Sequence, residues 1–197
     1  MTTLPNDARE VLDFWFGAPG TPEHGTQRQE WFRKDPAFDA RIAQRFETLV
    51  ERALDGGLRD WDEAGADAAL ARILVLDQFP RNIFRGSGRS FAGDALAQQA
   101  AQAMVAAGRD LELPPVRRWF VYLPYEHAET LPLQDEAVRL FSALVQAEPT
   151  LSGVMDYVHR HRDIILRFGR FPHRNEWLGR ASTPEELAFL KEPGSSF

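Results

Sequence analysis

Apolar residues recur at steps of three and four along most of the chain, which is the spacing of one face of an α-helix. The clearest stretch begins at Asp35 and Pro36, a pair typical of a helix start, and stops before Gly56. Its apolar stripe consists of Phe38, Ile42, Phe46, Leu49, Val50, Ala53 and Leu54. Alternating apolar and polar positions, as in a half-buried strand, are hard to find. The pattern therefore predicts an all-α protein.

The same spacing predicts further helices, and single residues mark several of their boundaries. We expect Pro80 to end one helix, Ser90 to cap the next, and Thr183 to begin a short final helix. The connections are short, so neighbouring helices should be antiparallel. We therefore expect an array of about eight helices packed as antiparallel hairpins in a single domain over residues 1–197. The helical ranges expected outside 35–54 are about 11–16, 66–80, 91–107, 115–123, 133–148, 151–168 and 184–190.

Composition and charge narrow the functional classes. Hydrophobic residues make up 44% of the chain and charged residues 26%, which excludes collagen-like, low-complexity and wholly disordered proteins. The net charge of -6 argues against partners that need an excess of positive charge, namely nucleic acid and anionic membranes. The sequence shows no secretory leader and no apolar stretch long enough for a membrane span, so we expect a cytoplasmic protein.

Cysteine is absent, which excludes disulfides, thiolate metal sites and cysteine nucleophiles. A metal ion, if one is used, would need nitrogen and oxygen ligands. The cofactor therefore stays unknown at this point, with a divalent metal held by imidazoles and carboxylates as one alternative. The sequence does not determine the oligomeric state.

Basic residues concentrate in two similar segments. Residues 159–180 carry six arginines and three histidines against two acids, a net charge of +4 in an otherwise acidic chain. Within them, Phe171 to Gly179 resembles Phe79 to Gly86, with one residue inserted after the proline. Each of these two segments follows a helix and turns the chain, and we call them the two corners. If the two corners meet in space, they form a positive pocket suited to a phosphate or carboxylate. Alternatively, these arginines cap helix ends and pair with acids on neighbouring helices.

Histidine and glutamate residues form a second candidate group. His161 lies on the apolar stripe of its helix, and the segment from Tyr122 to Glu129 contains Glu126 and His127. Together with His161 or His173, the two glutamates could hold a hard divalent metal or act as a general acid–base pair. The alternative is structural: a core histidine bonded to a backbone carbonyl or a carboxylate, glutamates favoured by the dipole at a helix start, and a buried Asp77–Arg81 pair that locks a corner.

Several motifs together resemble one family over nearly the whole chain. They are Val11 to Gly17, Leu76 to Gly86, Tyr122 to Glu129, Arg167 to Asn175 and Pro193 to Phe197. The sequence is similar to the bacterial "domain of unknown function 924" family, and the resemblance implies a fold like the helical arrays of tetratricopeptide repeats. It implies no activity. Phe197 could dock its ring and carboxylate into a basic groove of its own chain, or the tail could serve as a ligand for another copy or a partner.

Two functional hypotheses follow. In the first, the protein binds an anionic small molecule, and His161, Glu126, Glu129 or His127 transfers protons. In the second, the helical array is an interaction module whose groove recognises a peptide or an acidic tail. A third alternative is that the motifs only stabilise the fold. The ligand-binding residues expected under the first hypothesis are Asp77, Arg81, Asn82, Arg162, Arg170, His173, Arg174 and Asn175.

Overall fold

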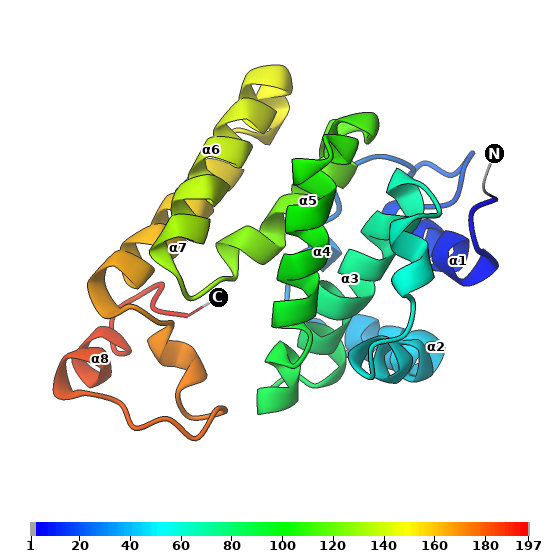
Figure 1. The fold of residues 1–197 in the computed structure, drawn as a ribbon. Coiled ribbons are helices and arrows are strands. Elements are labelled where there is room, and N and C mark those ends of the chain that lie inside the picture. Colours follow the sequence, from blue (N-terminus) through cyan, green and yellow to red (C-terminus); the bar gives the residue numbers. More distant parts are fainter. Residues whose placement is uncertain (1–2, 197) are drawn as a thin grey trace.

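The computed structural model describes residues 3–196, and this part of the chain contains eight α-helices, six short 3-10 helices and no strand. Figure 1 shows α6 and α7 side by side at one end of the molecule, α1 and α2 at the other, and α3 to α5 between them. The prediction of an all-α array of about eight helices is confirmed. The α-helices are α1 (Asn6–Phe16), α2 (Pro36–Leu54), α3 (Ala66–Ile83), α4 (Asp94–Ala106), α5 (Pro115–Glu126), α6 (Leu131–Ala147), α7 (Val154–Phe168) and α8 (Pro184–Phe189).

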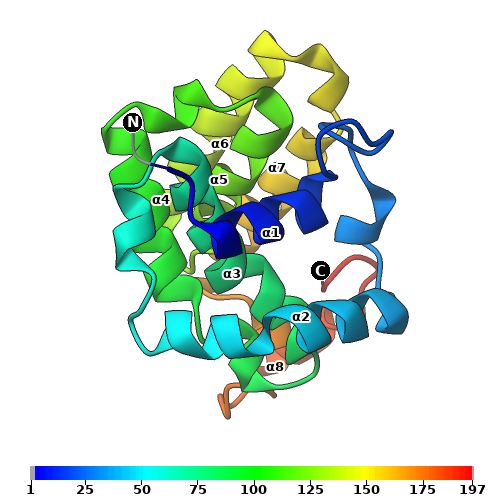
Figure 2. The same ribbon diagram turned by 90° about the vertical axis from the view of Figure 1, so that its right-hand side faces the viewer.

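Helix α3 is the centre of the packing. It contacts α1, α2, α4 and α5, and Figure 2 shows it behind α1 and α2. Almost every residue of α3 from Ala66 to Pro80 is buried, because neighbours cover it on all sides. Consecutive helices from α2 to α7 also contact each other, as expected for hairpins with short connections. The likeness to tetratricopeptide arrays stays a prediction.

Two helix starts follow the sequence signals closely. The Asp35 carboxylate accepts hydrogen bonds from the backbone N–H groups of Ala37 and Phe38, with Pro36 as the first helical residue. These bonds, together with the charged neighbours Arg33 and Arg41, hold the pKa of Asp35 below its usual range. At α8, Thr183 and Glu186 form a reciprocal capping box. Both signals are local, which is why the sequence predicts them well.

The prediction that Pro80 ends its helix is wrong, because α3 continues to Ile83. Proline has no N–H, so Pro80 cannot donate the helical hydrogen bond to the carbonyl of Leu76. Gly93 packs directly against that carbonyl, and a Cβ atom there would lie 2.0 Å from the Leu76 oxygen. The close backbone approach therefore occupies the space beside the carbonyl, and it requires glycine at position 93.

Other boundaries also differ from the expected ones. Ser90 does not cap α4; its hydroxyl donates to the carbonyl of Phe84, while Ser87 caps the 3-10 helix Gly88–Phe91. Pro124 lies inside α5, and α7 begins three residues after Leu151. Ser90 and Leu151 belong instead to short 3-10 helices, Gly88–Phe91 before α4 and Pro149–Leu151 before α7. Within residues 3–196, no helix has the length and apolar character needed to cross a membrane.

Candidate functional site

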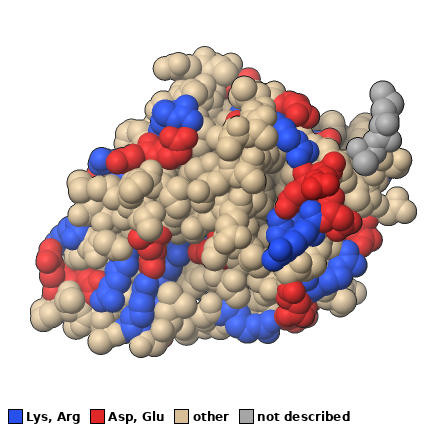
Figure 3. Space-filling model, viewed as in Figure 1, with Lys and Arg blue, Asp and Glu red and all other residues tan. Residues whose placement is uncertain are grey.

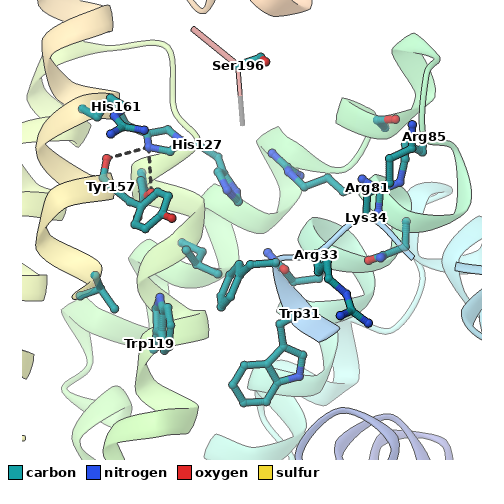
Figure 4. Close-up of a pocket in the computed structure, with 18 of the residues that line it drawn as sticks. Trp31, Arg33, Lys34, Arg81, Arg85, Trp119, His127, Tyr157, His161 and Ser196 are labelled. Atoms are coloured by element: carbon teal, nitrogen blue, oxygen red, sulfur yellow. Dashed lines mark hydrogen bonds and ion pairs between the residues drawn. The ribbon is translucent and has the colours of Figure 1, made fainter. Parts of the chain in front are cut away.

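A cavity of about 870 Å³ opens between the two ends of the helical array. In Figure 4, His161 and Tyr157 lie on one side of it, Arg81 and Arg85 on the other, and Trp31 and Trp119 at its base. Its walls come from α3, α5 and α7, from the segment after α7, and from the loop before α2. The volume is in the range of about 300–1,000 Å³ that small-molecule sites occupy. Of the residues predicted as site residues, the cavity lining includes Arg81, Asn82, Glu126, His127, His161, His173 and Arg174.

The two similar corners meet at the carboxylate of Asp94, the first residue of α4. Arg81 donates to both oxygens of Asp94, at 2.8 and 3.1 Å, and Arg174 donates to Oδ2 at 3.0 Å. The two arginines occupy the same position in the two corner motifs, after the inserted His173 is allowed for. The two corners therefore do meet in space, with an acid from a third segment between their arginines.

The similarity of the corners extends to their asparagines. Asn82 donates to Asp39 at 2.7 Å, and Asp39 also accepts two hydrogen bonds from Arg85. Asn175 likewise donates to Glu186 at 3.2 Å, where Arg170 forms a bidentate pair at 2.7 and 2.8 Å. In both corners, the asparagine and a neighbouring arginine share one carboxylate. These hydrogen bonds fix the first corner to α2 and the second corner to α8.

Asp77, which lies behind the cavity wall, pairs with His127, which is part of it. His127 Nδ1 lies 2.8 Å from Asp77 Oδ1, and the Asp77 side chain is 1% exposed. Burial alone raises the pKa of Asp77, but the Arg81 guanidinium and His127 hold it well below its usual range. Because a carboxylate can only accept, Nδ1 of His127 carries the proton. Burial and the charge of Arg81 lower the pKa of His127, so the ring is neutral at pH 7 and Nε2 keeps its lone pair.

His161 is held in a similar way by α5 and its own helix. Its Nδ1 lies 2.9 Å from the carbonyl oxygen of Tyr157 and 2.9 Å from Oε1 of Glu126 (Figure 4). The carbonyl can only accept a hydrogen bond, so Nδ1 of His161 is also protonated. The two imidazole rings are 6.3 Å apart between centroids. Nδ1 thus carries a proton in both histidines, and it faces the Asp77 carboxylate in His127 and the Tyr157 carbonyl and Glu126 carboxylate in His161.

His173 is the third imidazole of the cavity. Burial, followed by the charges of Arg174 and His161, lowers the pKa of His173 to about 3. Burial also lowers the pKa of Arg174 to about 10 against the opposing charge of Asp94, so its guanidinium stays protonated at neutral pH. Over residues 3–196, no three His, Asp or Glu side chains converge in the arrangement that would hold a metal ion.

Five of the predicted site residues lie outside the cavity lining: Glu129, Asp77, Arg162, Arg170 and Asn175. Arg162 pairs with Asp135 at 2.7 Å on the surface of α6 and α7. Glu129 forms a bidentate pair with Arg180, which lowers the pKa of Glu129 although burial opposes it. In Figure 3, basic and acidic side chains alternate around the α8 end of the molecule, where Arg167 and Arg170 of the basic segment pair with Glu185 and Glu186.

The sequence reasoning missed several cavity residues. Arg33, Lys34 and Arg160 line the cavity, as do the rings of Phe32 and Tyr157. Two signals were available in the sequence. Residues 31–34 place two aromatic side chains directly before two cations, and Lys34 is one of only two lysines in the chain. Neither signal indicates a site until the fold brings α7 opposite this loop.

The tail reaches the cavity at Ser196, which lies at its upper edge in Figure 4. The hydroxyl of Ser195 donates to the carbonyl of Leu190 at 3.1 Å. Gly194 lies beside Arg160, since a Cβ atom there would be 3.1 Å from a guanidinium nitrogen. The expectation for Phe197 falls on a residue outside the described range, so it stays a prediction.

Comparisons with known proteins identify the family but no activity. A solved structure of a protein of unknown function, ATU0120 from Agrobacterium tumefaciens, is similar, with 40% sequence identity and a TM-score of 0.79. The match covers 93% of this chain and 96% of that one. No curated protein matches the sequence. A profile of the bacterial proteins of unknown function DUF924 matches residues 11–194, and the chain therefore belongs to this family.

Proposed function

We propose that the cavity binds a small molecule with an anionic group, and that Arg33, Lys34 and Arg160 receive this group. The observation that carries the proposal is the difference in charge compensation along the cavity wall. Within residues 3–196, Lys34 and Arg160 make no ion pair, and Arg33 lies 3.7 Å from Asp35 with its side chain 67% exposed. Two cations without an ion pair and a third with one long ion pair, all at one opening, give a positive potential that attracts an anion.

The inner guanidiniums contribute less to this potential. Arg81 and Arg174 share Asp94, and Arg81 also lies 3.2 Å from Asp77. Two guanidiniums thus face two carboxylates, and His127 is neutral at pH 7. The inner wall is therefore rich in hydrogen-bond donors but has little net charge. It suits the polar body of a ligand better than its ionised group.

The cavity also supports proton transfer as part of this function. His127 has a protonated Nδ1 fixed by Asp77, which leaves Nε2 as the atom that accepts a proton. His161, fixed by Glu126, lies on the adjacent part of the wall. A ligand held by its anion at the opening would place its remainder near these imidazoles. Acid–base chemistry on a bound organic anion is the reaction class that this arrangement favours.

The scarcity of lysine provides a direct test of the anion site. Reductive methylation with ¹³C-formaldehyde labels only Lys34, Lys191 and the N-terminal amine, and it keeps the positive charge of each lysine. We expect titration with inorganic phosphate or acetate to shift the Lys34 signal in a saturable way. Lys191, which does not line the cavity, is the internal control. Equal, linear shifts of both lysines would show only an ionic-strength effect and would overturn the proposal.

The variant Lys34→Ala gives the matching energetic test. Loss of a charge-assisted hydrogen bond costs about 1.5–3 kcal/mol, so affinity should fall by roughly tenfold or more. Lys191→Ala should leave it unchanged. Because both lysines are exposed, neither variant should alter the fold, which circular dichroism can check. Equal affinity in the two variants would place the anion elsewhere.

A further inference from the structure

Exposed aromatic side chains gather around this one cavity. Within residues 3–196, three aromatic residues are exposed: Phe32 at 57%, Tyr157 at 57% and Trp177 at 45%. All three line the cavity. They come from three separate places in the chain, namely the loop before α2, helix α7 and the segment before α8. Exposed aromatic surface that converges from distant segments on one cavity is typical of a binding site for an apolar group.

Buried aromatic rings continue this surface inward. The Phe32 ring stacks on Trp119, with 5.0 Å between ring centroids and 23° between planes. Trp119 in turn contacts Trp31 edge to face at 6.4 Å. In Figure 4, Trp31 and Trp119 lie at the base of the cavity. The cavity thus has an aromatic floor whose rings are fixed by contacts with one another.

Aromatic rings and uncompensated cations occur together on both sides of the opening. On one side, Phe32 is followed directly by Arg33 and Lys34 in the same loop. On the other side, Tyr157 and Arg160 lie one turn apart on α7, with the guanidinium carbon 5.8 Å from the ring centroid. A ligand that used only its charge would gain nothing from these rings. A ligand that used only apolar surface would gain nothing from the cations.

We propose that the ligand is an aromatic organic acid, whose ring lies on the aromatic floor while its carboxylate binds Arg33, Lys34 or Arg160. This inference rests on the proposed anion site and names its ligand class. An aryl carboxylate satisfies both features of the opening with one molecule, and the cavity volume accommodates a ring with further substituents. The polar groups of the inner wall, the acceptor Nε2 of His127 and the donors of Arg174, are then available to those substituents.

The test compares three simple probes of increasing similarity to the inferred ligand. Binding of acetate, phenylacetate and the neutral phenylacetamide is followed by the ¹³C signal of methylated Lys34 and by isothermal titration calorimetry. Burial of the ring should make phenylacetate bind at least about tenfold more tightly than acetate. Phenylacetamide should bind more weakly than phenylacetate by a similar factor, because it lacks the charge.

Substitutions of the exposed aromatic residues test whether their rings cause the tighter binding of phenylacetate relative to acetate. Phe32→Ala and Tyr157→Ala should each reduce the advantage of phenylacetate over acetate while affinity for acetate changes little. Leu187→Ala, which removes an equally exposed apolar side chain outside the cavity, is the matched control and should have no effect. All three side chains are more than half exposed, so the folded state should tolerate their loss.

The outcomes separate this inference from the proposed function. If acetate and phenylacetate bind equally and both depend on Lys34, the inferred aromatic ligand class is wrong, whereas the proposed anion site is supported. If phenylacetamide binds as tightly as phenylacetate, the ligand is not an acid and this inference is overturned. If no probe shifts the Lys34 signal and calorimetry detects no binding, both proposals fail.

Discussion

The inner wall and the opening of the cavity carry the same kinds of cation in different surroundings. On the inner wall, the side chains of Arg81 and Arg174 are 20% and 7% exposed, and both bind Asp94. At the opening, Arg33, Lys34 and Arg160 are exposed; within residues 3–196, Lys34 and Arg160 make no ion pair, and Arg33 has a single contact at 3.7 Å with its sequence neighbour Asp35. The inner guanidiniums connect α3, α4 and the segment after α7, whereas the outer cations connect nothing.

This difference indicates two separate roles for the basic residues. A buried charge that lost its partner would cost several kcal/mol, so the inner pairs are required for the folded state. An exposed cation without a partner adds nothing to stability, and it stays available for a ligand. We therefore expect substitutions on the inner wall to change stability and substitutions at the opening to change binding.

The largest expected effect is on the inner wall, at Asp94. Asp94→Asn keeps the shape of the side chain but leaves the charge of Arg174 uncompensated and that of Arg81 only partly compensated. We expect the free energy of unfolding to fall by about 3–5 kcal/mol, measured by urea denaturation. The matched control is Glu136→Gln, which breaks an exposed pair with Arg139 and should cost less than about 1 kcal/mol. Similar losses of stability in both variants would contradict the distinction between buried pairs that stabilise the fold and exposed pairs that do not.

The second effect is a pH dependence of stability that arises from the neutral histidines of the cavity. The pKa of His173 is about 3 in the folded protein and about 6.5 when unfolded, so below pH 6.5 the unfolded chain binds more protons. The contribution of His173 to the free energy of unfolding is therefore fully present above about pH 6.5, and it is lost as the pH decreases toward 3. His127, whose pKa is also lowered, contributes in the same direction. From pH 6.5 to about 5, His173 alone should cost up to about 2 kcal/mol.

His173→Gln checks this dependence. Urea unfolding between about pH 7.5 and 5 should show a smaller slope in the variant, because one of the titrating groups has been removed. This range stays above the region where Asp77, Glu129 and Glu186, whose pKa values are lowered, lose their contribution on protonation. A slope equal to that of the unchanged protein would show that His173 is not the source.

The fold was predictable from the sequence wherever a local signal decides the structure. The spacing of Phe38, Ile42 and Phe46 and the cap at Asp35 depend on neighbours within one helix. The path of the chain at Pro80 depends instead on Gly93, thirteen residues away, whose backbone packs against the Leu76 carbonyl. A rule for proline based on local structure cannot include such a contact.

The site was predictable only in part, for a related reason. The corner motifs indicated Arg81 and Arg174, and the structure brings both to the cavity. Charge density alone could not distinguish them from Arg162 and Arg170, because the acids that compensate these two residues, Asp135 and Glu186, come from α6 and α8. The opening was missed because its two sides are more than 120 residues apart in the chain.

A smaller effect on stability is expected at the opening. The double substitution Arg33→Ala and Lys34→Ala removes two exposed cations and should change the free energy of unfolding by no more than about 0.5 kcal/mol. The same protein should lose most of its affinity for phosphate or acetate. Urea unfolding and calorimetric titration on one preparation measure both quantities. A large loss of stability would place these cations in the same class as Arg81 and Arg174.

The smallest effect on binding is expected for Arg162→Gln, which also separates charge density from location. Arg162 belongs to the most basic segment of the sequence, but its side chain is 31% exposed and its partner Asp135 is 53% exposed. Removal of this pair should cost less than about 1 kcal/mol in urea unfolding. Because Arg162 does not line the cavity, affinity for acetate and phenylacetate should stay within error of the unchanged protein. Weaker binding in this variant would mean that the overall charge of α7, rather than the cations at the opening, attracts the anion.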